Sequence, residues 1–425
     1  MRIVSGREAS AMVERLAARG ARLTGLEPRV RRIVNDVRQG GDRSLRRYAE
    51  RWDGLAAKQP LQVSEEEMAE AWRTLAPELR KSLRQAAQNI RRFCEWQKPS
   101  NWMRTRVGIS LGQIVRPLDS VGCYVPGGRY PLISTVLMTV IPAEVAGVKN
   151  IRVVSPKPPA EVLAAAAMLG VRELYRVGGA QAIAALAYGT SSIPRVDKIV
   201  GPGNAYVTAA KKLVAFDCAI DFLAGPTEVV ILSTALSNSL SNSQSDSSVP
   251  EFIAADLVAQ AEHDPETLAL LITTSPALAR AVSGAIEQLA KGNPTALKSL
   301  RARGALLVAA SREQARDWAN QIAPEHITIA EEDLPFVHSA GSVFVGDYSA
   351  QAAGDYASGP NHVLPTSGQA RFRGGLSVTD FVKVITVQQL SAVGLKRIAP
   401  AIECLAEAEG LAAHARSIRV RCEHA

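Results

Sequence analysis

The sequence is poor in cysteine and contains no apolar segment long enough to cross a membrane. Its five cysteines are scattered and never form a CxxC pair, which argues against a disulfide framework or a thiolate zinc site and favours a reducing compartment. The most apolar stretch, residues 131–148, is interrupted by Pro142 and Glu144 and falls short of a spanning helix. The first ten residues, MRIVSGREAS, lack the apolar core of a signal peptide. We therefore expect a soluble cytoplasmic protein without a membrane partner.

The sequence also lacks the usual dinucleotide fingerprint, because no GxGxxG occurs in it. Three glycine turns precede predicted helices, namely PGG (126–128), GGAQ (178–181) and GPGN (201–204). Helix N-termini of this kind can hold a phosphate group. Every connection from a strand to a helix needs such a turn, however, so each one is equally compatible with a structural role.

The bulk composition is that of a globular protein. Hydrophobic residues make up 47% and charged residues 21% of the 425 residues, which excludes a disordered chain, and the length predicts two or more domains. Residues 1–110 hold 23 basic and 13 acidic side chains, a net charge of +10, so the rest of the chain carries −2 of the total of +8. Such an excess is compatible with a nucleic-acid partner. Because acidic residues are interleaved with the basic ones, we favour a solvated, Arg-rich helical face and expect no nucleic-acid partner.

The hydrophobic pattern changes after the first quarter of the chain. In residues 79–94 apolar side chains recur every three or four positions, which indicates an amphipathic helix. From about residue 116, short apolar runs end in glycine or proline and alternate with alanine-rich helical runs, including predicted strands at 268–273, 326–329 and 342–345. This alternation is typical of a parallel α/β sheet. We predict a helical N-terminal region (1–110), two Rossmann-like α/β domains (111–232 and 233–375), a Ser-rich insertion (236–250) in the second domain, and a helical C-terminal tail (376–425).

Four of the six histidines lie near other ligand-type or acid–base residues. Gln260 and His263 are three residues apart in a predicted helix over 252–263, so they would share one face and could bind a divalent ion. A structural histidine near a helix end is the plainer alternative. Glu325 and His326 are adjacent at the start of a predicted strand, which suits proton transfer in tandem, although such a pair at a strand edge can also be merely solvated.

The other two histidines extend this pattern. Asp355 and His362 lie in the Gly- and Pro-rich loop GDYASGPNHVLPT, whose backbone is suited to holding side chains in place. His414 follows Glu409 in the predicted last helix. A mixed set of amide, imidazole and carboxylate ligands without sulfur favours zinc or a similar transition ion over calcium, and it leaves a position open for a substrate.

A series of long and uncommon strings runs from about residue 121 to residue 388, and a last one lies in the tail. The strings are YVPGG, PLISTVLMTVIPAEVAG, VGGAQAIAALAYGT, VDKIVGPGNAYVTAAKK, IDFLAGPTEV, DLVAQAEHDPE, PEHITI, AGSVFVGDYS, AGDYASGPNHVLPT, GLSVTDFVKVITVQ and EAEGLAAHARSIRVR. In content and in order they closely resemble the histidinol dehydrogenase family, whereas residues 1–110 add little to the resemblance.

The resemblance implies an α/β fold with two incomplete Rossmann-like parallel-sheet domains between helical N-terminal and C-terminal segments, which agrees with the missing fingerprint. It implies oxidation of L-histidinol to L-histidine in two NAD-linked steps through L-histidinaldehyde, the last step of histidine biosynthesis. It also implies zinc and NAD as cofactors, and a homodimer in which the C-terminal tail is exchanged between subunits.

Individual residues receive roles from the same resemblance. The catalytic acid–base pair falls on Glu325 and His326, the zinc ligands on Gln260, His263, Asp355 and His414, and the nucleotide contacts on Tyr124, Gln181 and Asn204. The substrate contacts fall on Thr227, His362, Glu409, His326 and the four zinc ligands. Thr227 replaces the serine of many members and retains its hydroxyl group, so we expect little effect. A cysteine thiohemiacetal is disfavoured, because Cys123, the one cysteine near a motif, has no neighbouring base in the sequence.

Two other functions remain as alternatives. One is a related dehydrogenase of the same family that acts on another small alcohol, such as a sulfonated diol. The other is a non-catalytic, metal-dependent binding protein that uses the basic N-terminal face. The pair Glu325 and His326 argues against a binder, which needs no acid–base pair, and His362 with Glu409 favours histidinol, because both match positions assigned to histidinol contacts.

Overall fold

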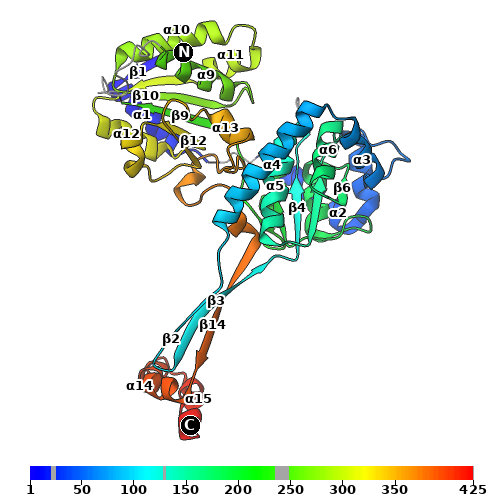
Figure 1. Ribbon diagram of the computed structural model, residues 1–425, viewed down its shortest axis with the longest axis vertical. Helices are drawn as coiled ribbons and strands as arrows, with labels where there is room; N and C mark the ends of the chain where they lie inside the picture. The colour runs from blue at the N-terminus through cyan, green and yellow to red at the C-terminus, as the bar shows by residue number, and fades with distance from the viewer. Residues whose placement is uncertain (21–24, 128–130, 235–247, 425) are drawn as a thin grey trace.

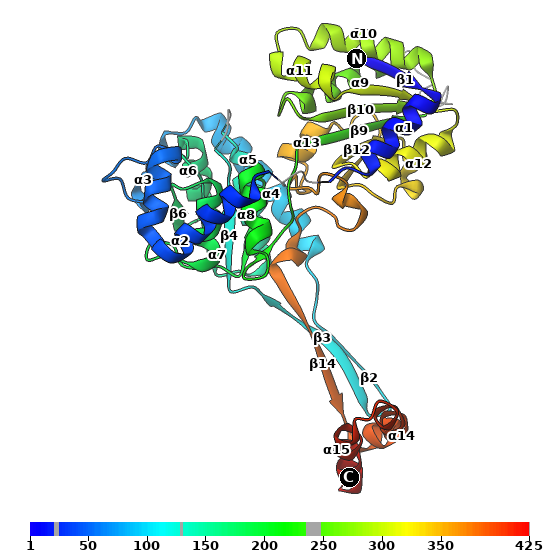
Figure 2. The ribbon, with the colours of Figure 1, turned by 180° about the vertical axis from the view of Figure 1, so that it is seen from behind.

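The computed structural model describes residues 1–20, 25–127, 131–234 and 248–424. Within these ranges the chain forms two parallel sheets, each with helices on both faces, and a three-stranded antiparallel ribbon that projects away from both (Figures 1 and 2). The predicted α/β class with two parallel-sheet domains is therefore confirmed. No helix in the described part of the chain is long and apolar enough to span a membrane. Most of the predicted insertion, residues 236–247, lies outside the described residues.

The first domain is built on a five-stranded sheet in the order β6-β5-β4-β7-β8, with every pair parallel. Its strands are β4 (Ser120–Tyr124), β5 (Asn150–Val154), β6 (Glu173–Tyr175), β7 (Lys198–Val200) and β8 (Ala219–Ile220). One face packs on α3 (Glu65–Thr74), α4 (Pro77–Gln97), α5 (Ile133–Ala146) and α6 (Ala160–Met168). The other packs on α2 (Glu27–Tyr48), α7 (Gly179–Tyr188) and α8 (Ala205–Val214). Strands buried on both faces read as continuous apolar runs, as β4 does.

The second domain has a six-stranded parallel sheet in the order β1-β11-β10-β9-β12-β13. Its strands are β1 (Arg2–Ser5), β9 (Glu228–Ser233), β10 (Leu268–Thr273), β11 (Ala305–Val308), β12 (His326–Ile329) and β13 (Ser342–Val345). Helices α1 (Gly6–Ala17) and α12 (Arg312–Ile322) cover one face, while α9 (Val249–Ala261), α10 (Pro276–Leu289) and α11 (Pro294–Ala302) cover the other. The short helix α13 (Gln351–Tyr356) follows β13 and packs beside α9.

The predicted N-terminal region, residues 1–110, is not a single helical unit. Its first segment supplies β1, which pairs with β11 at the edge of the second sheet, and α1, which packs on α12. Only α2, α3 and α4, with the π-helical turn Ala49–Asp53, cover the first domain. β1 escaped prediction because it has four residues, of which only Val4 is buried, too few for a periodic signal.

The predicted C-terminal tail, residues 376–425, is not helical throughout either. Strand β14 (Val382–Leu390) pairs antiparallel with β3 (Ile109–Pro117), which in turn pairs with β2 (Trp102–Arg106). Helices α14 (Ala392–Ala408) and α15 (Ala412–Glu423) pack on each other at the far end of this ribbon (Figure 1). The strand carries the alternating pattern VKVITVQQL, but most of its side chains are exposed in a single chain, so burial by neighbours does not explain the pattern.

The segment after α13 runs back to the first domain. The second domain therefore ends earlier than the predicted boundary at residue 375. Val363, Leu376, Val378 and Phe381 all lie in the core of the first domain with α4 and α5. The amide of Asn361 donates to the carbonyl of Met138 in α5 at 2.6 Å. The chain thus leaves the second sheet after α13 and is packed against the first domain before residue 375.

Candidate functional site

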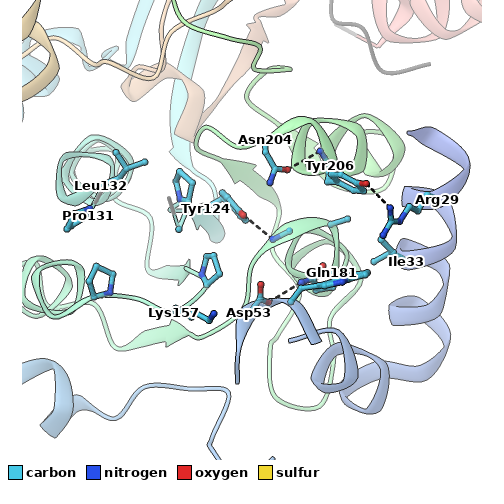
Figure 3. A pocket seen from close by; sticks show the side chains of 17 residues that line it. Arg29, Ile33, Asp53, Tyr124, Pro131, Leu132, Lys157, Gln181, Asn204 and Tyr206 are labelled. Atoms are coloured by element: carbon cyan, nitrogen blue, oxygen red, sulfur yellow. Dashed lines mark hydrogen bonds between the residues drawn. The ribbon is translucent and has the colours of Figure 1, made fainter. Parts of the chain in front are cut away.

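A cavity of about 750 Å³ lies at the carboxyl ends of the strands of the first sheet (Figure 3). All three predicted nucleotide contacts line it, with Tyr124 at the end of β4, Gln181 in the first turn of α7 and Asn204 at the start of α8. Ligands of open α/β sheets bind outside the carboxyl ends of the strands. The structure thus brings Tyr124, Gln181 and Asn204 together in a place suited to a nucleotide, and their contacts with it stay a prediction.

The walls of this cavity are held by hydrogen bonds from the glycine turns. The hydroxyl of Tyr124 accepts from the amide of Gly179 at 3.0 Å, and burial raises the pKa of Tyr124 to about 12, so the phenol stays neutral. The side-chain oxygen of Asn204 accepts from two backbone amides of α8 and caps that helix. Gly201 is required by its backbone, because its φ is +112° and a Cβ would lie 2.2 Å from the carbonyl oxygen of Tyr124.

Three charged residues of the cavity were not found from the sequence. Arg29, Asp53 and Lys157 line it together with the predicted residues. Asp53 Oδ2 accepts from the amide of Gly178 at 2.9 Å and from Nε2 of Gln181 at 3.0 Å, so it fixes the turn and the predicted contact at once. Arg29 and Asp53 come from the N-terminal helices, far from any glycine motif, and no local pattern could have identified them.

A second cluster lies at the amino ends of β9 and β12 in the second domain. The two strands are parallel, with His326 opposite Val229, so Glu325 and His326 lie beside Thr227 and Glu228. Helix α9 leads into β10, the other neighbour of β9, and therefore ends at this same edge with Gln260. The predicted acid–base pair and the predicted metal ligand Gln260, from separate places along the chain, are thereby brought to one edge of one sheet.

The hydrogen bonds of His326 determine its tautomer. Its Nδ1 lies 3.2 Å from the carbonyl oxygen of Glu228, and because a carbonyl can only accept, Nδ1 carries the hydrogen. Nε2 therefore holds the lone pair. Nε2 is buried, has no hydrogen-bond partner among the described residues and lies 3.6 Å from Oδ1 of Asp355. The structure thus presents a free basic nitrogen in a buried site.

Glu325 is held next to this imidazole. Its Oε2 accepts from the backbone amide of Glu228 at 2.9 Å and lies 3.7 Å from Nδ1 of His326. Burial raises the pKa of Glu325 to about 8. Burial opposes a charge on His326, but the carboxylates of Glu325 and Asp355 outweigh it and raise the pKa of His326. Both groups can therefore gain or lose a proton near neutral pH.

The donor set around Asp355 fits a divalent cation. Gln260 is 2% exposed, and its Nε2 donates to Oδ2 of Asp355 at 3.0 Å, whereas its Oε1 is buried without a partner among the described residues. Burial raises the pKa of Asp355, but the nearby imidazoles of His326, His362 and His263 outweigh it and lower that pKa. An orphaned amide oxygen beside a carboxylate and imidazoles is a plausible set of zinc ligands. No cluster of three or more His, Cys, Asp or Glu ligands is already assembled within the described ranges.

The predicted geometry of His263 is wrong in one respect. Helix α9 ends at Ala261, so His263 lies in the turn after it and does not share a helix face with Gln260. It is exposed, yet close enough to Asp355 to lower the pKa of that carboxyl. His362 is half-buried, and its Nδ1 lies 2.8 Å from the backbone oxygen of Asp355.

Two predicted residues lie elsewhere in the same chain. Glu409 ends α14 and His414 lies in α15, both exposed at the far end of the ribbon (Figures 1 and 2). A single chain therefore brings Gln260, His263 and Asp355 together without His414. Cys123 is fully buried, and burial raises the pKa of its thiol to about 12, which agrees with the exclusion of a cysteine nucleophile.

Comparison with known proteins identifies the family. The family model described as histidinol dehydrogenase matches residues 17–422. The chain belongs to the histidinol dehydrogenase family. It is 48% identical over 404 residues to a histidinol dehydrogenase of Methanothermobacter thermautotrophicus, covering 92% of both chains, and 47% identical to that of Geobacillus kaustophilus at the same coverage. A crystal structure of histidinol dehydrogenase from Elizabethkingia anophelis superposes with a TM-score of 0.91 at 35% identity, covering 100% of this chain and 98% of the other.

The family predicted from the motifs is thereby confirmed, and so is the activity class. The chain is an NAD-dependent oxidoreductase of the histidinol dehydrogenase family. The alternative of a related enzyme for another small alcohol is not favoured, because relatives at this coverage are named histidinol dehydrogenase. The non-catalytic binding protein is set aside for the same reason.

The burial of Glu325 predicts that its replacement stabilises the fold at alkaline pH. The folded-state pKa, about 8, is above the ordinary value of 4.5, so between these values the unfolded state releases a proton that the folded state keeps. The free energy of unfolding therefore falls as the pH rises through this window. Glu325→Gln should unfold at a higher temperature than the parent at pH 8 and at a similar temperature at pH 4.5. One pKa unit corresponds to about 1.4 kcal/mol, so the difference at pH 8 should be on the order of a few kcal/mol.

Thermal unfolding of both proteins at the two pH values measures this difference. Glu331→Gln, which replaces an exposed carboxyl of the same domain, is the control and should follow the parent at both pH values. If Glu325→Gln shows no gain at pH 8, the carboxyl is not destabilised by burial.

Proposed function

We propose that this chain oxidises L-histidinol to L-histidine through L-histidinaldehyde, the last step of histidine biosynthesis, at a zinc-dependent site around His326. The observation that carries this proposal is the buried, unpartnered Nε2 of His326 beside Asp355 and the orphaned oxygen of Gln260. The imidazole of His326 would accept the hydroxyl proton of an amino alcohol as it is oxidised. The oxygens of Asp355 and Gln260 would hold a cation beside it. The named relatives support the choice of histidinol.

Gln260, His263, Asp355 and His414 would hold the zinc ion. When bound, the ion would supply a Lewis acid to the substrate. His362, whose Nδ1 lies 2.8 Å from the backbone oxygen of Asp355, and Thr227, which precedes Glu228 in the chain, would contact the substrate. Because Nε2 of Gln260 already donates to Asp355, its oxygen is left as the atom that can bind the ion.

The first oxidation needs a proton acceptor at the hydroxyl group. The carbinol carbon gives a hydride to NAD while its hydroxyl group gives a proton to Nε2 of His326, which leaves the aldehyde. The carbonyl of Glu228 holds Nδ1 of the same ring, so the resulting imidazolium is stabilised at its other nitrogen. General-base catalysis of this kind contributes about 10² to 10⁴ in rate.

The second oxidation needs water added to the aldehyde. Glu325 would take a proton from the attacking water while the His326 imidazolium returns its proton to the carbonyl oxygen, which gives a neutral gem-diol and frees Nε2 of His326. The pKa of Glu325, about 8, makes it a suitable base near neutral pH. The gem-diol then gives a second hydride to a second NAD, and His326 again accepts the proton of a hydroxyl group. The product is the carboxylic acid.

We further propose that the NAD lies in the first-domain cavity, held by Tyr124, Gln181 and Asn204. The cavity volume of about 750 Å³ is in the range of cofactor sites. The N-termini of α7 and α8 point into it and would face the pyrophosphate.

The ribbon and tail are the basis for proposing a homodimer. Exposed large apolar side chains gather on them: Trp102, Met103, Leu111, Val384, Ile385, Leu390, Val393, Leu405, Leu411 and Val420. Such a surface is unusual for a chain without a partner. Docking it on a second copy would bury these side chains and bring Glu409 and His414 to the site of that copy.

The proposed function predicts turnover with a defined stoichiometry. Purified protein with zinc, NAD and L-histidinol should form two NADH for each histidine, measured by absorbance and by chromatography. Activity with another small alcohol and none with L-histidinol would refute the proposal.

Two substitutions should separate the two half-reactions. Glu325→Gln should retain part of the alcohol oxidation but lose histidine formation, because hydration of the aldehyde needs the carboxylate. His326→Asn should slow both steps by about 10² or more, because each hydride transfer needs a proton acceptor. NADH bursts measured separately with L-histidinol and with L-histidinaldehyde distinguish the two variants. Equal loss of both half-reactions in both variants would contradict this division.

Exchange of the tail predicts complementation between inactive chains. A His414→Ala chain mixed with a His326→Ala chain gives mixed dimers in which one site has an intact core and an intact partner tail, and the other carries both lesions. Activity should return to about half of the normal value for each mixed dimer. Mixing His414→Ala with Glu409→Gln is the control, because every site then keeps one tail lesion. Restoration in the control, or none in the test, would show that each chain completes its own site.

A further inference from the structure

We propose that Glu228 is the positioning residue of the acid–base pair and that Arg19 locks it in place. The proposal rests on the proposed roles of Glu325 and His326. It begins from the backbone of Glu228, whose amide donates to Glu325 at 2.9 Å and whose carbonyl oxygen lies 3.2 Å from Nδ1 of His326. One residue thus holds both members of the pair.

The position of Glu228 in the sheet explains why its backbone faces the pair. Pairing of β9 with β12 begins at Val229, opposite His326, so Glu228 lies at the start of this pairing. The amide and carbonyl of one strand residue point to the same side. On the side of β12, the amide of Glu228 donates to the side chain of Glu325, and its carbonyl oxygen has Nδ1 of His326 within hydrogen-bond distance.

The side chain of Glu228 is fixed as tightly as its backbone. Arg19 donates to it through Nε at 2.7 Å and through Nη2 at 2.5 Å, which is the two-point geometry of a strong guanidinium–carboxylate pair. The amide of Ser367 also donates to Oε1 at 3.0 Å. Glu228 is 4% exposed, so these partners replace water around its carboxylate. The side chain cannot turn toward solvent without breaking its hydrogen bonds with them.

Arg19 in turn is anchored to two further elements. Its Nη1 donates to the carbonyl of Leu16 in α1 at 2.6 Å and to that of Ile322 at the end of α12 at 2.7 Å. The guanidinium therefore joins the N-terminal segment, α12, the loop at Ser367 and the first residue of β9. Rotation of the backbone at Glu228 would move both Glu325 and His326. The hydrogen bonds of Arg19 and Ser367 oppose that rotation.

The simpler role for this ion pair is stability alone. A buried charge pair is costly to form, and breaking one by removing a partner strongly destabilises the fold, so loss of stability would not distinguish the two roles. The position of the pair does distinguish them, because it is attached to the single residue that contacts both Glu325 and His326. Loosening it should reduce turnover in the folded enzyme while substrate and NAD bind as before.

Arg19→Met, Arg19→Lys and Glu228→Gln test this, with Arg316→Met as the matched control. Arg316 pairs with the buried carboxylate of Asp333 in the same domain, away from the catalytic pair. kcat per folded molecule should fall at least tenfold in Arg19→Met, with the KM values for L-histidinol and NAD within about twofold of the parent. Arg19→Lys, which keeps the charge but not the two-point geometry, should recover part of kcat. Arg316→Met should lose stability with kcat unchanged.

Glu228→Gln keeps the side-chain volume and an acceptor for Ser367, so it is informative even if Arg19→Met does not fold. It should show the same fall in kcat with unchanged KM values. Unchanged kcat in Glu228→Gln, or an equal fall in kcat in Arg316→Met, would overturn the positioning role of Glu228. The proposed function would still stand in that case, provided that the parent turns over L-histidinol. A parent that does not turn over L-histidinol at all would instead refute the proposed function.

Discussion

The parallel pairing of β9 with β12 is the constraint on which the candidate catalytic site depends. Because the two strands start at one edge, with His326 opposite Val229, residues nearly a hundred positions apart along the chain come into hydrogen-bond contact. Helix α9 returns to the same edge before β10 and delivers Gln260 there. Asp355 reaches this edge on α13, which packs against α9. A slip of register between these strands would separate the pair from its backbone contacts.

The two sheets use opposite edges for different tasks. The first sheet presents its carboxyl edge, where glycine turns and helix N-termini suit a nucleotide. The second presents its amino edge, where helix C-termini and strand starts gather polar side chains. The segment between α13 and β14 connects the two, because His362 contacts Asp355 in the second domain while the adjacent Asn361 bonds to Met138 in the first. Neither domain therefore forms the whole site.

Sequence reasoning succeeded where a signal is local and failed where it is not. β10, β12 and β13 begin and end at the predicted residues, because each is a short apolar run bounded by turn residues. The motifs also led to the candidate acid–base pair, Glu325 and His326, and to the candidate nucleotide contacts, whose roles stay predictions. β1 was missed because it is a short edge strand that pairs only with β11, which is distant in the sequence. The end of α9 two residues before His263 has no mark in the sequence. Arg19, Asp53 and Glu228 were missed because they act through partners remote in the chain or through their backbone.

The separation of the cavity from the acid–base cluster affects how the reaction can proceed. Every residue that lines the cavity lies between positions 29 and 206, and none belongs to the second sheet. In a two-hydride reaction, a spent nucleotide must depart and a fresh one must arrive while a reactive aldehyde waits. Under the proposed function, residues of the second sheet would retain the aldehyde while the nucleotide at the first sheet is exchanged. An aldehyde held in this way would not reach the amines of other proteins between the two transfers of hydride.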